Sequence, residues 1–133
     1  MSITLDLSYI SELVMVDIGL WNKKIKNYSR MLITVDTGAS VTTISTDVLH
    51  TLGYDVSSGK KYKIITASGV EFMNVITLEK IRLGNIELKD IKAYAHTFPE
   101  SSFSMGVIGL NILKQFNVYF HFSKKEMELA KIP

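Results

Sequence analysis

One acidic residue stands where it could take part in chemistry. Asp36 follows directly on the largely apolar, β-branched residues 32–35, and after it come Thr37, Gly38 and the small residues 39–40. A run of apolar, β-branched residues is typical of a buried strand, and a glycine two positions after the acid is typical of a tight turn. A carboxylate that a strand carries into such a turn can act as a general acid or base on a bound water. Stability alone does not call for this arrangement, so we interpret Asp36 as a candidate functional residue.

Three stretches of the sequence resemble parts of a known protein family. Residues 32–40 resemble the Asp-Thr-Gly signature of aspartic proteases, and residues 107–116 resemble the strand and helix that brace the catalytic loop of that family. Residues 117–129 resemble the closing β-hairpin of retropepsin-like domains. The signature occurs once, which is the pattern of the retropepsin-like (retroviral-type) branch in its single-domain cellular or bacterial form. The resemblance implies a mostly-β fold: a retropepsin-like closed β-barrel, the acid protease fold at half size, with one or two short helices.

The resemblance also implies an activity and a catalytic set of Asp36, Thr37 and Gly38. Peptide hydrolysis needs a base to activate water and an acid for the leaving group, and two carboxylates about 3 Å apart supply both because they share a proton. With one aspartate per chain, we expect an aspartic endopeptidase that is active as a homodimer. Thr37 is expected to hydrogen-bond across the dimer axis, and Gly38 to offer the carboxylate an N–H donor. Ala39 carries no hydroxyl to support the ionised carboxylate, so we expect a mildly acidic to near-neutral pH optimum.

A hairpin in the middle of the chain is the expected substrate-binding element. Residues 62–67 and 70–78 predict two strands that meet at a Ser-Gly tip. The resemblance implies that this hairpin closes over an extended peptide as a flap, although an ordinary exposed hairpin explains the same pattern equally well. The candidate substrate-binding residues are Ala39, Ala67, Ser68 and Gly69.

Composition narrows the classes of protein and partner. The chain has 133 residues and a net charge of +2, which predicts one domain over residues 1–133 and no nucleic-acid or membrane partner. Cysteine is absent and the three histidines lack zinc-ligand spacing, so we expect no metal and no cofactor. The amino-terminal residues carry no secretory signal pattern, which predicts a cytoplasmic protein.

The remaining pattern predicts many short strands and two short helices, as in a β-barrel. Strands are expected at residues 13–18, 31–35, 41–44, 62–67, 70–78, 81–83, 86–88, 91–95, 105–109, 118–122 and 127–129. Helices are expected at residues 45–53 and 110–116, the first with Ser45 or Thr46 as its amino-terminal cap and Gly53 as its left-handed end. The polar, lysine-rich residues 19–30 predict a long connection between two strands.

Two other functions fit the same sequence. A catalytically silent dimeric module on the same fold would bind peptide without cleaving it, although the retention of Asp36 argues against simple loss of activity. A β-rich structural protein, in which Asp-Thr-Gly is only a turn, would be a stable monomer. Incubation with a mixed peptide library separates the first two, because fragments indicate an enzyme and retention without fragments indicates a binding module.

Overall fold

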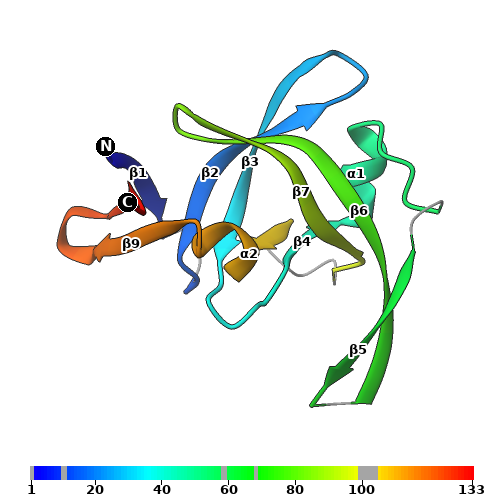
Figure 1. Cartoon of the computed structure of the whole chain (residues 1–133). Coiled ribbons are helices and arrows are strands. Elements are labelled where there is room, and N and C mark those ends of the chain that lie inside the picture. The colour runs from blue at the N-terminus through cyan, green and yellow to red at the C-terminus, as the bar shows by residue number, and fades with distance from the viewer. Residues whose placement is uncertain (1, 10–11, 58–59, 68, 99–104) are drawn as a thin grey trace.

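The computed structural model describes residues 2–9, 12–57, 60–67, 69–98 and 105–133. These residues form β-strands and three short helical segments (Figure 1). The strands are β1 (Ser2–Ser8), β2 (Met15–Asn22), β3 (Asn27–Val35), β4 (Thr42–Ser45), β5 (Lys61–Thr66), β6 (Gly69–Leu83), β7 (Ile86–His96), β8 (Gly106–Ile108), β9 (Phe116–His121) and β10 (Glu126–Lys131). The helices are α1 (Thr46–Thr51), α2 (Leu110–Leu113) and the 3₁₀ turn η1 (Phe122–Lys124). None of these helices has the length and hydrophobicity that crossing a bilayer requires.

Six of the strands close into a barrel. Their order is β6-β7-β4-β8-β3-β2, and a further pairing of β6 with β2 joins the two ends. The closing pairs are Gly19 with Arg82 and Leu20 with Ile81. β3 and β8 run parallel, as do β4 and β7, while the other neighbours are antiparallel. The predicted mostly-β closed barrel with short helices is confirmed.

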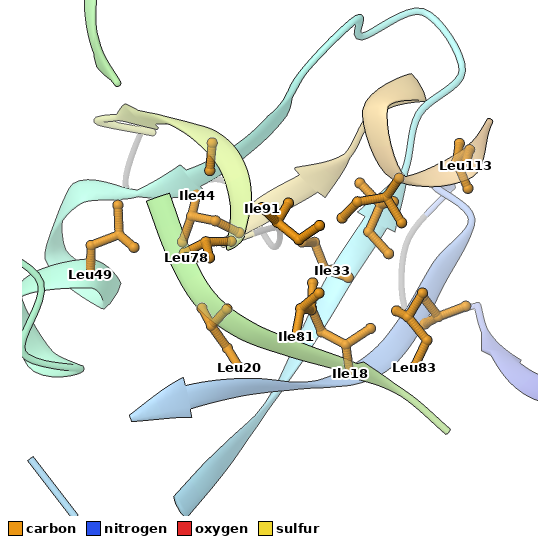
Figure 2. Close-up of a cluster of buried hydrophobic side chains, with 14 of the residues drawn as sticks. Ile18, Leu20, Ile33, Ile44, Leu49, Leu78, Ile81, Leu83, Ile91 and Leu113 are labelled. Atoms are coloured by element: carbon orange, nitrogen blue, oxygen red, sulfur yellow. The ribbon is translucent and has the colours of Figure 1, made fainter. Parts of the chain in front are cut away.

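The barrel is filled by one face of each strand. Figure 2 shows the side chains of the central cluster pointing toward one another from β2, β3, β4, β6 and β7. Among them, Leu20, Ile33, Ile44 and Leu78 are fully buried, with 0% of their surface exposed. Buried residues alternate with more exposed ones along β4 and along most of β6 and β7, which is the period of two that a one-sided sheet requires. β2 is buried along most of its length on both faces.

The two ends of the chain form a small antiparallel sheet beside the barrel. β1 pairs with β10, and β10 pairs with β9, so the chain termini lie near each other (Figure 1). The last residues of β1, Leu7 and Ser8, also pair with the start of β2 and attach this sheet to the barrel. The first dozen residues, for which the sequence offered no assignment, thus provide a strand.

The expected long connection at residues 19–30 is wrong. β2 and β3 continue through this stretch as a hairpin in which Trp21 pairs with Tyr28, and only the tight turn between Asn22 and Asn27 is irregular. The Asn22 side chain accepts the N–H of Lys24 at 3.0 Å and closes the turn. The lysines lie in the exposed turn at residues 23–26, and their exposure there does not exclude strand pairing on either side of the turn.

Two smaller expectations also need correction. The predicted breaks after residues 78 and 88 do not end the strands, because β6 and β7 pair from Leu83 and Ile86 outward to Asn74 and Ala95. The register omits only Glu79 and Asp90, and Asp90 has φ of +54°. Ser45 occupies the amino-terminal cap position of α1, but its side chain makes no cap hydrogen bond. It is also the last residue of β4, and its N–H donates to the Met105 carbonyl at 2.8 Å. The left-handed end of α1 at Gly53 is confirmed, with φ of +88°.

Candidate active site

Asp36 begins the loop that joins β3 to β4, and four hydrogen bonds fix where that loop starts. The Asp36 N–H donates to the Ile108 carbonyl of β8 at 3.0 Å, and the preceding Val35 N–H donates to the Val14 carbonyl at 2.8 Å. The Asp36 carboxylate Oδ1 accepts the Gly38 N–H at 2.8 Å, and the Asp36 carbonyl accepts the Ala39 N–H at 3.2 Å. The predicted N–H donor from Gly38 is therefore present. These bonds hold the carboxylate in one position relative to the barrel.

The loop presents the carboxylate at the surface of the chain. Asp36 and Ala39 are half-buried, while Thr37 and Gly38 are exposed. A Cβ atom at Gly38 would lie 3.1 Å from Asp36 Oδ1, so a side chain there would crowd the carboxylate. The three candidate catalytic residues thus form one compact group that another molecule can reach.

The start of α2 supports the other end of this loop. The Leu110 N–H donates to the Ala39 carbonyl at 2.8 Å, and the Asn111 N–H donates to the Ser40 carbonyl at 3.1 Å. The first N–H groups of a helix have no partner within the helix, so they are free to bind these carbonyls. The bracing expected of residues 107–116 is observed as hydrogen bonds between backbone groups.

A side-chain network that the sequence analysis missed joins the same elements. Asn111 Oδ1 accepts both the N–H of Thr42, at 2.8 Å, and its hydroxyl, at 2.9 Å. The Thr42 hydroxyl in turn accepts the Gly109 N–H at 3.1 Å, and Asn111 Nδ2 donates to the Lys92 carbonyl at 2.8 Å. Thr42 is fully buried at an inward position of β4. A threonine at such an apolar position was the one available signal, because a buried hydroxyl needs a partner.

Gly109 allows this close packing. A Cβ atom at this position would lie 2.6 Å from the Val41 carbonyl carbon and 2.8 Å from the Ala39 oxygen. The Gly109 backbone is extended, with φ of −98°, so conformation does not require glycine here. Glycine is needed because the loop passes directly over it.

The site is therefore an Asp-Thr-Gly loop braced by a short helix. Comparison with known proteins finds the same kind of loop in one family. A sequence model of the family described as "gag-polyprotein putative aspartyl protease" matches residues 22–115. The chain belongs to the retropepsin-like aspartic protease family. The matched segment contains the Asp36 loop, the central hairpin and the bracing strand and helix.

A solved structure shows that the retropepsin-like fold extends over nearly the whole chain. The chain is similar to the crystal structure of a retropepsin-like aspartic protease from Rickettsia conorii, with 20% identity and a TM-score of 0.69. The likeness covers 97% of this chain and 90% of that protein. No curated protein matches the chain. The predicted retropepsin-like barrel is confirmed.

The retropepsin-like barrel carries the remaining candidate residues on the β5–β6 hairpin. Figure 1 shows this hairpin projecting from the barrel, with its far end well apart from the cyan β3–β4 connection that contains Asp36. Ala67 and Gly69 are exposed at this far end, and Gly69 has φ of +134°, which favours glycine. Ser68 lies outside the described residues. One chain thus brings Asp36, Thr37, Gly38 and Ala39 together but leaves the hairpin end separate from them.

The described parts of the chain contain no group of three His, Cys, Asp or Glu side chains that could hold a metal ion. The two ion pairs that they contain, Arg30 with Asp17 at 2.6 Å and His121 with Glu128 at 3.2 Å, involve other residues than the Asp36 loop. The Asp17 carboxylate raises the pKa of Arg30 by a hydrogen bond and by its charge. The polar chemistry of the candidate site therefore rests on Asp36 and on the backbone groups around it.

Proposed function

We propose that this protein is an aspartic endopeptidase that is active as a homodimer and hydrolyses bonds within extended peptide segments. The observation that carries the proposal is the Asp36 carboxylate, held by the Gly38 N–H at 2.8 Å in an exposed loop that α2 braces. A single carboxylate offers no acid beside the base, and an exposed half-site on a retropepsin-like fold calls for a second copy to complete it.

In the proposed reaction, Asp36 of one copy is ionised and Asp36 of the other is protonated. The ionised carboxylate takes a proton from a water molecule, whose oxygen attacks the carbonyl carbon of the peptide bond. The protonated carboxyl donates a hydrogen bond to the carbonyl oxygen and stabilises the developing negative charge. The tetrahedral intermediate then collapses as the C–N bond breaks, and the leaving nitrogen gains the proton that the first carboxylate took from the water. Thr37 and Gly38 hold the two loops in register in this proposal.

Exposed apolar side chains near the Asp36 strand support dimer formation. Tyr9, Leu13 and Phe122 expose 45%, 47% and 56% of their surfaces. Tyr9 and Phe122 are in contact through a hydrogen bond of 3.3 Å, and Leu13 precedes the residue that pairs with the end of β3. Exposed apolar groups of this size are common at surfaces that another protein covers. We infer that a second copy covers these residues.

The β5–β6 hairpin is the proposed flap. Ile65 and Phe72 expose 80% and 67% of their surfaces, although both are large apolar residues. Such exposure is costly in water and supports contact with another molecule, here the bound peptide or the second copy. We place Ala67, Ser68 and Gly69 over the substrate, with Ala39 beneath it. A cytoplasmic location stays a prediction from the amino-terminal sequence.

Replacement of Asp36 by asparagine tests the proposal. Asp36→Asn should abolish cleavage of a mixed peptide library and leave the unfolding midpoint and the dimer mass unchanged. Asp47→Asn, at an exposed carboxylate in the first turn of α1, is the matched control and should cleave normally. Cleavage by Asp36→Asn would refute the mechanism, and a monomeric mass at concentrations that support cleavage would refute the shared site. Peptide retention by the unaltered protein without fragments would favour the binding module.

A further inference from the structure

The chain contains two arginines, and the barrel brings both of them to one place on its outer face. Arg30 lies opposite Gly19 in the pairing of β3 with β2, and Gly19 lies opposite Arg82 in the pairing of β2 with β6. Residues opposite each other point to the same face of a sheet. Both arginines are exposed, so this face is the outer one. Only a glycine, which has no side chain, separates the two arginines.

A small pocket is built around this glycine. Its volume is about 150 Å³, and it is lined by Asp17, Ile18, Gly19, Arg30, Arg82 and Gly84. Another molecule can approach the backbone closely at the two glycines. The lining carries two guanidinium groups and one carboxylate, so the pocket has a net positive charge.

The carboxylate holds the first guanidinium at the pocket. The Arg30 Nη2 atom donates to Asp17 Oδ2 at 2.6 Å. A guanidinium has five N–H donors in a rigid plane, so this bond leaves donors for a second acceptor. Asp17 thus fixes the position of Arg30 without occupying all of its donors.

An aromatic ring holds the second guanidinium. The guanidinium carbon of Arg82 lies 4.5 Å from the centre of the Tyr28 ring, and a Cβ atom at Gly19 would lie 3.2 Å from the same ring. The Tyr28 hydroxyl donates to Glu87, which lies opposite Arg82 in β7. Among the residues that the structure describes, Arg82 forms no ion pair with a carboxylate. Stacking on a ring leaves the N–H groups at the edge of the guanidinium able to bind an anion.

The charges around the pocket favour an anion. Lys80 and Lys89 lie opposite each other, two positions further along the same strands, and the Lys80 Nζ lies 4.3 Å from the centre of the Trp21 ring. Residues two apart along a strand share a face. The basic groups of this face are Arg30, Lys80, Arg82 and Lys89, and its acidic groups are Asp17 and Glu87. The surplus of positive charge raises the local concentration of anions.

We propose that the pocket binds a phosphate group between Arg30 and Arg82. A carboxylate has two oxygens, which one guanidinium can bind, whereas a phosphate group has at least three acceptor oxygens and can bind two guanidiniums. A free phosphate compound and a phosphorylated side chain share this chemistry. The site goes beyond the proposed function, because Arg30 precedes Asp36 by six positions in extended chain, a separation of about 20 Å.

Titration with inorganic phosphate, followed by nuclear magnetic resonance, tests the site. At about pH 7.5, where phosphate is mostly a dianion, the backbone N–H signals of Gly19 and Gly84 should shift and saturate at constant ionic strength. Acetate, which one guanidinium can bind, should bind roughly fivefold more weakly. Absence of a saturating shift, or equal affinity for acetate, would overturn the site.

Variants separate the pocket from general attraction of anions. Arg82→Met should lower the affinity for phosphate roughly fivefold, and Arg82→Lys should also lower it, because lysine keeps the charge but not the planar set of donors. Arg30→Met provides a second test if Arg82→Met does not fold. Lys89→Met is the control, since it removes a charge from the same face outside the pocket, and should change the affinity less than about twofold. Equal losses in Lys89→Met and Arg82→Met would overturn the pocket.

Peptides identify the source of the phosphate group. A phosphoserine peptide that binds more tightly than inorganic phosphate would indicate a phosphorylated protein segment, and equal affinities would indicate a free phosphate compound. A phosphoserine peptide that binds no better than the same peptide with serine, together with no binding of inorganic phosphate, would overturn the proposal. Asp36→Asn should bind phosphate as the unaltered protein does, so the outcome does not depend on whether the protein cleaves peptides.

Discussion

Replacing Asn111 by alanine tests whether its side chain holds the Asp36 loop in place. Asn111 Oδ1 is the acceptor for both the N–H and the hydroxyl of Thr42, at 2.8 and 2.9 Å, and Nδ2 donates to the Lys92 carbonyl at 2.8 Å. Thr42 is fully buried, so water cannot replace the lost acceptor without opening the barrel. The change removes three hydrogen bonds at once.

The magnitude follows from the groups that lose their partners. A buried donor without an acceptor costs about 1–3 kcal/mol. The Thr42 N–H is fixed by the backbone and is left without an acceptor. The Thr42 hydroxyl can rotate toward another acceptor, and the exposed Lys92 carbonyl can bind water instead. We therefore expect Asn111→Ala to lower the free energy of unfolding by about 2–4 kcal/mol. Asn117→Ala, at an exposed position of β9, is the control and should change it by less than about 0.5 kcal/mol.

Urea unfolding of a double-mutant cycle measures the effect. Asn111→Ala, Thr42→Val and the double variant are compared at one protein concentration, because dimer formation adds to apparent stability. The midpoint should fall without a change in slope, and the two losses should fall short of additivity by about 1–2 kcal/mol. A loss below about 1 kcal/mol for Asn111→Ala, or strict additivity, would refute the reasoning.

Three further predictions concern other parts of the chain. Gly109→Ala should destabilise the fold by about 2 kcal/mol or more and impair cleavage, because the new Cβ would meet the Val41 carbonyl carbon at 2.6 Å; unchanged urea midpoints would contradict this. Tyr28 donates a hydrogen bond to Glu87 at 2.5 Å, which lowers the pKa of Glu87, whereas burial and this bond raise the pKa of Tyr28 to about 12. Because the folded state lowers the pKa of Glu87, this hydrogen bond stabilises the fold above the ordinary pKa of Glu, and the stabilisation is lost as pH falls. The difference in unfolding free energy between the unaltered protein and Tyr28→Phe should therefore shrink between pH 6 and pH 3 in urea titrations. A difference that widens over this range would contradict the prediction. Leu49→Ala, at a fully buried residue of α1, should lower the free energy of unfolding by about 2–5 kcal/mol, and a loss below about 1 kcal/mol in the same titrations would show that the site is not packed as described.

Local patterns in the sequence were sufficient for the elements around Asp36. Three local features each predict one element that the structure contains. The apolar run before Asp36 predicts a strand, Gly38 predicts a turn, and the segment that ends at Gly53 predicts a helix. The β5–β6 hairpin, in which Thr66 pairs with Gly69, follows from the same kind of signal. These features depend on neighbours within a few positions, where propensity and alternation act directly.

The polar composition of residues 19–30 gave a wrong prediction of a long connection. Lysines and asparagines there suggested a connection, yet the Trp21–Tyr28 pair continues the hairpin, with the two rings in edge contact at 5.3 Å. Leu20 is fully buried, whereas residues 23–27 form an exposed turn rich in lysine and asparagine, so composition alone does not distinguish this hairpin from a loop. Pairing with a neighbouring strand decided the outcome.

The sequence by itself determined the kind of fold and the residue that could do chemistry, because both are written in short, contiguous patterns around Asp36. Only the tertiary structure decided that Thr42 is held by Asn111, 69 positions further on, and that β6 pairs with β2 to close the barrel. Such partners are chosen by strand register and by the need of each buried polar group for a hydrogen bond. Neither condition produces a periodic pattern in the sequence, so these partners can be identified only from the closed barrel.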